Sequence, residues 1–263
     1  MTPIKILIST MPTWVTLEAN RYNEVDLIAS PPVLGSNDAK QFFLKLRESP
    51  QNGVQVIEQY HKRQLPEFCL ERHINPDHTF CLYYGSESPI QSQSGAMDWW
   101  LGLSAFLANQ LYAETYEVWP LAAGLSHGDA ANYQLKMEAL ADPLGWKDDL
   151  LKSIFRGKGW LAERLPRISK NQDRVLNARS PCPRGCTQKH KILRNKPCSY
   201  SSCFRNCQKQ HRSIPRINCP HRSVVEQLIL LEHKRRSKER NIINTLKKNG
   251  KRCCGTMRDC PLR

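Results

Sequence analysis

The chain has 263 residues, a formal net charge of +15 and a hydrophobic content of 40%. This length suits one large domain or two ordinary ones. No apolar run approaches the roughly 20 residues that a membrane-spanning helix needs. The first residues also lack a basic stretch that leads into an apolar segment with a cleavage site. We therefore expect a cytoplasmic protein that does not enter a membrane.

The charge is divided unevenly along the chain. Residues 161–263 hold 26 Lys and Arg against 6 Asp and Glu, whereas residues 1–160 hold 13 and 18. Nine of the eleven cysteines lie at or after Cys182, and all six tryptophans lie at or before Trp160. This division predicts a globular domain over residues 1–162, a cysteine-rich region over 163–222, and a basic helix with a cysteine-containing tail over 223–263.

The first domain contains short apolar or alternating runs that are typical of strands. They lie at residues 4–8, 25–29, 54–58 and 68–70. Between them, Asn37-Asp38 is a cap signal that predicts a short helix through Leu46. Turn signals such as Pro31-Pro32 separate these elements.

The later part of the first domain has the periodicity of helices. Asp98 precedes an apolar stripe that ends at Leu111, and Asp129 precedes a second stripe that ends at Asp142-Pro143. Strands followed by helices favour an α+β fold. Beyond the cysteine-rich region, a basic amphipathic helix is predicted over residues 222–248.

One segment carries a pattern typical of catalysis. His73-Ile74-Asn75 is followed by a polar turn and then by Phe80-Cys81-Leu82, and an aromatic-rich helix comes some 17 residues later. This order resembles the catalytic core of ubiquitin-conjugating (E2) enzymes, and in particular the prokaryotic E2-like family. The sequence departs from the eukaryotic pattern, because Ile74 replaces the proline of His-Pro-Asn and only five residues separate Asn75 from Cys81.

The resemblance implies a UBC-like fold, with an antiparallel sheet and C-terminal helices, and a cysteine acyltransferase activity. Cys81 would accept an acyl group as a thioester, since a thiolate is both a good nucleophile and a tolerable leaving group. Asn75 would donate a hydrogen bond to the oxyanion, an effect of roughly 3 kcal/mol. His73 would hold the loop, and His127 would help to deprotonate the attacking amine.

The resemblance also implies partner proteins. An E1-like activating enzyme would load Cys81, because the sequence has no ATP-binding segment of that type. The cargo would be the C-terminus of a ubiquitin-like protein or of a cyclic-oligonucleotide synthase, in a bacterial antiphage or conjugation operon. Arg72, His73 and His78 are the positive neighbours expected to favour the thiolate of Cys81.

Other interpretations of these cysteines stay open. A cysteine between Phe80 and Leu82 is also typical of a buried core residue, as is Cys69 between Phe68 and Leu70. A Cys81–His127 pair would suit a cysteine hydrolase instead.

The cysteine-rich region has the short cysteine spacings that are common in metal sites. Metal binding would supply the folding free energy that so few apolar residues cannot. A disordered basic tail and disulfides are the alternatives. Cys253, Cys254 and Cys260 are candidates for a second zinc site. The expected ligands of a structural zinc ion are Cys182, Cys186, Cys198, Cys203, Cys207 and Cys219.

The basic run at residues 234–240 would attract the phosphates of a nucleic acid. A solvated helix face or a docking surface for an acidic protein explains it equally well. If the run binds a nucleic acid or a protein, the chain as a whole would be a zinc-dependent adaptor for that partner, with an inactive E2-like domain.

Overall fold

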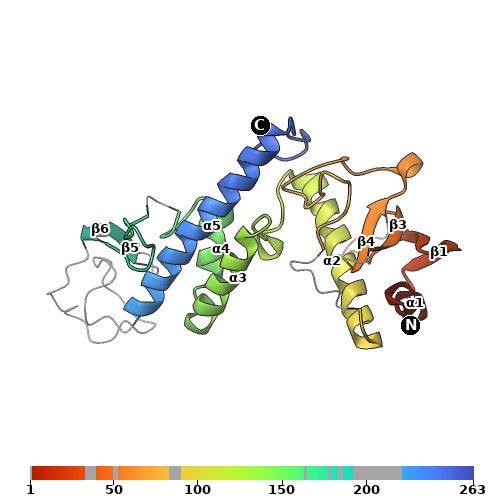
Figure 1. Cartoon of the computed structure of the whole chain (residues 1–263), viewed down its shortest axis with the longest axis horizontal. Helices are drawn as coiled ribbons and strands as arrows, with labels where there is room; N and C mark the ends of the chain where they lie inside the picture. Colours follow the sequence, from red (N-terminus) through yellow and green to blue (C-terminus); the bar gives the residue numbers. More distant parts are fainter. Residues whose placement is uncertain are drawn as a thin grey trace. The chain divides into compact units, whose positions relative to one another are not determined.

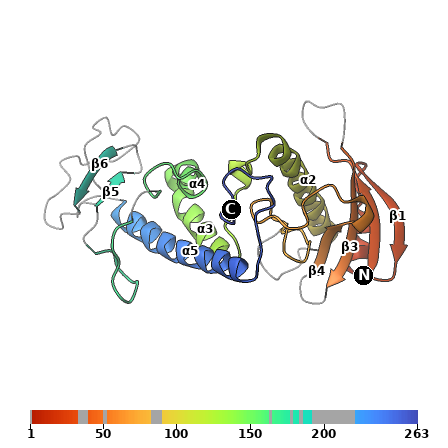
Figure 2. The same ribbon diagram turned by 90° about the horizontal axis from the view of Figure 1, so that it is seen from above.

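The computed structural model describes residues 2–32, 40–49, 53–82, 90–162, 165–176, 179–182, 186–191 and 221–263 (Figures 1 and 2). The chain divides into two compact units. The first combines Met1–Pro120 with Lys247–Arg263, and the second is Leu121–Leu246. The domain boundary expected at residue 162 therefore falls inside the second unit.

The first unit is built on a four-stranded antiparallel sheet, in the order β1-β2-β3-β4. Side chains of β2 alternate between half-buried and buried, which is the pattern of a sheet with one face on the core. The sheet and the helices beside it agree with the expected α+β fold. The strands are β1 (Val15–Arg21), β2 (Glu24–Ala29), β3 (Phe42–Ser49) and β4 (Gly53–Glu58).

Three of the predicted elements were wrong. Residues 68–70, expected to be a strand, hold only the bridge residue Cys69. The run at residues 4–8 forms the helix α1 (Pro3–Ser9), with the Oγ1 of Thr2 accepting a hydrogen bond from the Lys5 amide. The helix predicted through Leu46 is instead the strand β3. Its side chains alternate, and Phe42 and Leu44 are fully buried. In β3 the burial of an apolar face outweighs the local cap signal, whereas in α1 the cap at Thr2 and the proline at the first helical position favour the helix.

The helix α2 (Gln93–Tyr116) packs beside the sheet (Figures 1 and 2). It begins six residues earlier than expected, because Ser92 rather than Asp98 caps it through a 3.1 Å bond from the Gly95 amide. The indole N–H of Trp100 donates to the carbonyl of Leu7, which joins α2 to α1. The aromatic stripe on α2 is thus part of the core.

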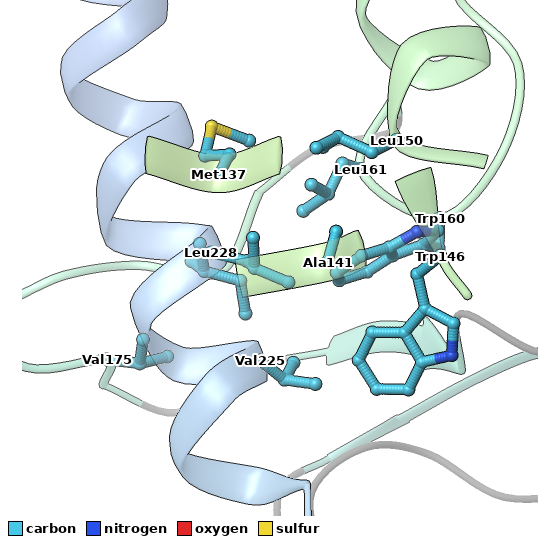
Figure 3. Packing of buried hydrophobic residues seen from close by; sticks show 10 residues of the cluster. Met137, Ala141, Trp146, Leu150, Trp160, Leu161, Val175, Val225 and Leu228 are labelled. Carbon is cyan, nitrogen blue, oxygen red and sulfur yellow. The ribbon is translucent and has the colours of Figure 1, made fainter. Parts of the chain in front are cut away.

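The second unit is mainly helical, and α5 packs along α3 and α4 (Figures 1 and 2). In Figure 3, Val225 and Leu228 of α5 point toward Ala141 and the two tryptophans Trp146 and Trp160. The predictions of a helix that ends before Asp142-Pro143 and of a helix over residues 222–248 are confirmed. The elements are α3 (Ala130–Ala141), α4 (Lys147–Phe155), β5 (Arg179–Cys182), β6 (Cys186–Lys191) and α5 (Arg222–Lys248), with short 3-10 turns at Tyr60–Lys62, Leu121–Ala123 and Asp142–Leu144.

Gly128, at the start of α3, is required by its surroundings. Its φ is +51°, and a Cβ atom there would lie 2.5 Å from the Cδ1 of Ile242 on α5. A side chain at this position would meet both backbone strain and a steric clash. The turn therefore allows α5 to approach α3 closely.

Charged residues of the basic run on α5 form ion pairs within the second unit. The Arg235 guanidinium is buried, and donates to Glu232, Glu239 and the hydroxyl of Ser126. Arg236 donates to Glu232 as well. These side chains neutralise one another within the unit, so this part of the run is not a freely solvated helix face.

Among the residues that the structure describes, no helix combines the length and the apolar character needed to cross a membrane.

Candidate functional site

Cys81 lies directly after the bridge residue Phe80, beside the sheet of the first unit. The Phe80 amide donates to the carbonyl of Val56 in β4 at 2.9 Å, and the Cys81 amide donates to the carbonyl of His73 at 2.8 Å. The Cys81 side chain is half-buried. Its backbone is thus held at two neighbouring points while part of its side chain remains accessible to solvent.

The segment before Cys81 folds back on itself twice. Cys69 and Ile74 pair through two backbone hydrogen bonds of 3.2 and 3.0 Å, and Ile74 also pairs with Phe80. The turn between the first pair places His73 at a φ of 55°. This fold brings the His73 carbonyl to the Cys81 amide, so His73 holds the cysteine through its backbone.

Asn75 belongs to a hydrogen-bonded turn. Its side-chain amide donates to the hydroxyl of Thr79 at 3.0 Å, and that hydroxyl donates to the carboxylate of Asp77 at 2.7 Å. The Asn75 backbone amide also donates to the Thr79 carbonyl. An asparagine amide nitrogen carries two N–H groups, and the bond to Thr79 uses one of them.

Aromatic rings support the loop from behind. Phe80 stacks on Phe106 of α2 with 4.8 Å between ring centroids, and Phe106 contacts Trp119. The His73 ring lies 5.1 Å from the Trp119 ring. Phe80 and Trp119 are buried, so apolar packing fixes the side of the loop away from solvent.

A buried reciprocal pair ties the turn to α2. The Arg72 Nε donates to the Gln110 side-chain oxygen at 2.7 Å, and the Gln110 side-chain nitrogen donates to the Arg72 carbonyl at 2.7 Å. Sequence reasoning missed Gln110, because a single polar residue in an apolar stripe carries no signal of its partner. Thr79 was missed for the same reason.

The electrostatic surroundings of Cys81 differ from expectation. Burial raises the pKa of the Cys81 thiol above its ordinary value. Arg72 is engaged with Gln110, and the His78 Nδ1 makes its hydrogen bond with the Glu67 carbonyl. Burial is thus the cause that sets the direction of the shift, and the expected stabilisation of the thiolate by Arg72, His73 and His78 stays a prediction.

His127 lies in the second unit, on the turn before α3. Its Nδ1 is 3.3 Å from the Glu239 carboxylate. Burial raises the pKa of Glu239, but the hydrogen bond with His127 and the charge of Arg235 outweigh it and hold that pKa below its usual range. This arrangement orients the imidazole, and the expected action of His127 on Cys81 chemistry stays a prediction.

The expected zinc ligands are only partly within the described structure. Cys182 and Cys186 are opposite partners in the β5–β6 hairpin, although only their backbone is described. The other four lie outside the described residues, at Cys198, Cys203, Cys207 and Cys219.

The C-terminal segment, residues 247–263, is a part of the first unit that the sequence did not predict. The Arg258 amide donates to the carbonyl of Glu117 at the end of α2, and Arg72 donates weakly to Thr256. Met257 and Leu262 are buried. These two apolar residues in a polar tail were the one available signal that the segment packs against a core.

Comparison with known families gives two adjacent matches. Residues 18–121 match the model of a prokaryotic E2 domain. Residues 126–202 and 196–262 match the model of a cysteine-rich domain that is C-terminal to an E2 domain. No curated protein and no solved structure matches the chain. The boundary between the family matches lies close to the division between the two structural units.

Proposed function

Since the chain belongs to the family of prokaryotic E2 domains followed by a cysteine-rich C-terminal domain, we propose that it carries a protein C-terminus as a thioester on Cys81. The acyl group then passes to an amine. The observation that carries this proposal is the placement of Cys81, which is half-buried on a loop whose backbone is fixed to His73.

The loading step exchanges one thioester for another. The Cys81 thiolate attacks the carbonyl carbon of a cargo thioester on an E1-like enzyme, and the thiolate of that enzyme leaves. Because burial raises the pKa of Cys81, only a small fraction of the thiol is ionised near neutral pH. Removal of the proton by the partner, or by solvent, is then part of the loading step.

The transfer step forms an amide and regenerates the thiol. The attacking amine adds to the thioester carbonyl, negative charge develops on the oxygen, and the Cys81 thiolate leaves as the intermediate collapses. Asn75 is proposed to stabilise that oxygen with an amide N–H, while Thr79 holds the amide in place. The His73 carbonyl fixes the cysteine backbone through both steps.

His127 is proposed to accept the proton of the attacking amine. The support is the contact of its Nδ1 with Glu239, which orients the ring. A carboxylate in this position also stabilises the protonated ring. The Glu239→Gln variant tests this role, because it keeps the size of the side chain but removes the charge.

The cysteine-rich domain is proposed to bind zinc in a structural role. The antiparallel hairpin pairs Cys182 with Cys186 across a short turn, and cysteines so close in space and sequence suit thiolate coordination. The proposed remaining ligands are Cys198, Cys203, Cys207 and Cys219. Bound zinc would supply folding free energy to a segment with few apolar residues.

The proposed partners follow from the chemistry. An E1-like activating enzyme supplies the activated carboxyl group, and the cargo is a ubiquitin-like protein or a cyclic-oligonucleotide synthase in an antiphage or conjugation operon. Nucleic-acid binding through the basic tail is proposed as well, and it would use residues other than Arg235 and Arg236, which pair with Glu232.

The test is a loading assay with the full chain, a cognate E1-like enzyme, ATP and cargo. Wild type should give an adduct that a reductant removes, Cys81→Ala should give none, and Cys81→Ser should give a reductant-resistant ester. Cys253→Ser is the matched control, since Cys253 is another half-buried thiol of the same unit. An adduct that persists in Cys81→Ala would refute the proposal.

A further inference from the structure

The C-terminal segment brings a second thiol to the buried thiol of Cys69. The Sγ atoms of Cys69 and Cys254 lie 2.8 Å apart, although 185 residues separate them in sequence. Cys69 is fully buried, as expected of a core cysteine, and Cys254 is half-buried. Sequence reasoning could not find this pair, because the two cysteines are too far apart in sequence to form a recognisable spacing motif.

Backbone hydrogen bonds at Cys69 and side-chain contacts at Cys254 hold the two sulfurs in place. Cys69 exchanges two hydrogen bonds with Ile74. On the tail, the Cys254 sulfur lies 3.1 Å from the Thr256 hydroxyl, and Thr256 accepts a 3.4 Å hydrogen bond from Arg72. The approach of the sulfurs is therefore built into the packing of residues 247–263 on the first unit.

The distance between the two sulfurs can be compared with the distance between two zinc ligands and with that in a disulfide. Two thiolates on one tetrahedral zinc ion, each at about 2.3 Å from the metal, stand about 3.8 Å apart. A disulfide needs about 2.05 Å. At 2.8 Å the sulfurs of Cys69 and Cys254 lie between these two spacings and are close enough to bond after a small movement.

The surroundings of Cys69 and Cys254 agree with their interpretation as a redox pair. Across the described ranges, no group of three or more His, Cys, Asp or Glu side chains is arranged to hold a metal ion. The two other thiols of the tail, Cys253 and Cys260, interact with each other. Within those ranges Cys69 and the thiols of the tail pair two by two, and a second zinc site that includes the tail cysteines stays a prediction.

The two sulfurs differ in character. The hydrogen bond with Cys254 and burial raise the pKa of Cys69 far above its usual range. The hydrogen bond with Cys69 lowers the pKa of Cys254 to about 5, and Thr256 and Arg72 act in the same direction. The half-buried thiol of Cys254 meets a reagent from solvent first, and the buried thiol of Cys69 beside it can then act as the resolving partner.

We propose that Cys254 and Cys69 are an oxidation site, which a low-molecular-weight disulfide converts to an intramolecular disulfide. The Cys254 thiolate attacks one sulfur of a glutathione-type disulfide, and one small thiolate leaves. That thiolate takes the proton of Cys69, and the Cys69 sulfur attacks Cys254 and releases the second small thiolate. The two protein sulfurs are oxidised together, and the small disulfide is reduced to two thiols.

The bond would fasten the C-terminal segment to the first unit. Cys69 pairs with Ile74, Ile74 pairs with Phe80, and Phe80 precedes Cys81. The oxidation site is thus connected to the Cys81 loop through two β-bridges. The proposal concerns bond formation at Cys69 and Cys254, and it holds whether or not Cys81 carries an acyl group.

The test uses the reduced full chain, incubated with oxidised glutathione, blocked with an alkylating agent and digested without reductant. Mass spectrometry should find one peptide pair that joins Cys69 to Cys254 and disappears on reduction. Cys254→Ser should abolish that pair, and the control Cys253→Ser should retain it. Cys69→Ala, which keeps a small apolar side chain in the core, should accumulate a glutathione mixed disulfide on Cys254.

Two results would overturn the proposal. One is a set of disulfides in oxidised wild type that omits the Cys69–Cys254 pair while other thiols react. The other is a zinc ion in the purified chain that Cys254→Ser loses and Cys182→Ser keeps, because the pair would then be metal ligands. Circular dichroism of each variant checks that it is folded, and the Cys81 loading assay is not needed for either result.

Discussion

The Gln110→Leu variant tests whether the buried pair with Arg72 holds the catalytic loop on α2. Leucine keeps most of the volume, but it removes the acceptor of the 2.7 Å bond from the Arg72 Nε and the donor to the Arg72 carbonyl. A lost hydrogen bond to a charged group costs about 1.5–3 kcal/mol, and an orphaned buried carbonyl about 1–3 kcal/mol. We expect the free energy of unfolding to fall by about 3–5 kcal/mol.

Urea unfolding followed by tryptophan fluorescence measures this loss. With a denaturant slope of about 2 kcal/mol per molar, the midpoint should fall by about 2 M. Gln93→Leu is the matched control, since it makes the same chemical change at an exposed position of the same helix, and it should change stability by no more than about 0.5 kcal/mol. A Gln110→Leu variant as stable as this control would refute the reasoning.

Three further predictions concern the second unit and the nucleophile. Glu232→Gln should lower the free energy of unfolding by about 1.5–3 kcal/mol, since it removes the charge of a buried carboxylate that pairs with both Arg235 and Arg236, while Glu239 still pairs with Arg235; an unchanged melting temperature would contradict this. Gly128→Ala should cost about 2–4 kcal/mol through its positive φ and the clash with Ile242, and urea unfolding should show a lowered midpoint rather than an unaltered one. The alkylation rate of Cys81 by iodoacetamide should still rise with pH beyond the range of an ordinary thiol, because burial raises its pKa; a plateau below pH 8 would contradict the burial argument.

The sequence predicted those parts of the fold whose signal is local and periodic. The alternating run over β2, the helix before Asp142-Pro143 and the long helix α5 all have such a pattern. The segment at residues 4–8 misled because its apolar run has no clear period and the signals of the helix, Thr2 and Pro3, lie outside the run. For β3, the alternation through Phe42 and Leu44 outweighs the cap signal at Asn37-Asp38.

The candidate site was predictable only where residues follow one another in the chain. The order of His73, Asn75 and Cys81 is a sequence pattern, and the structure brings them to one folded-back loop. Contacts across long separations, such as Gln110 with Arg72 or Cys254 with Cys69, carry no comparable local signal. The raised pKa of Cys81 likewise depends on burial. The flanking Phe80 and Leu82 indicate that Cys81 is buried, but they do not indicate how deeply.

The most direct measurement of the central claim is the position of the acyl group in the loaded chain. The wild-type chain, loaded with cargo and kept at low pH without reductant, is digested, and the peptides are sequenced by mass spectrometry. We predict that the remnant of the cargo C-terminus lies on the sulfur of Cys81. A remnant on another cysteine, or the absence of any remnant when the E1-like enzyme itself is charged, would contradict the account.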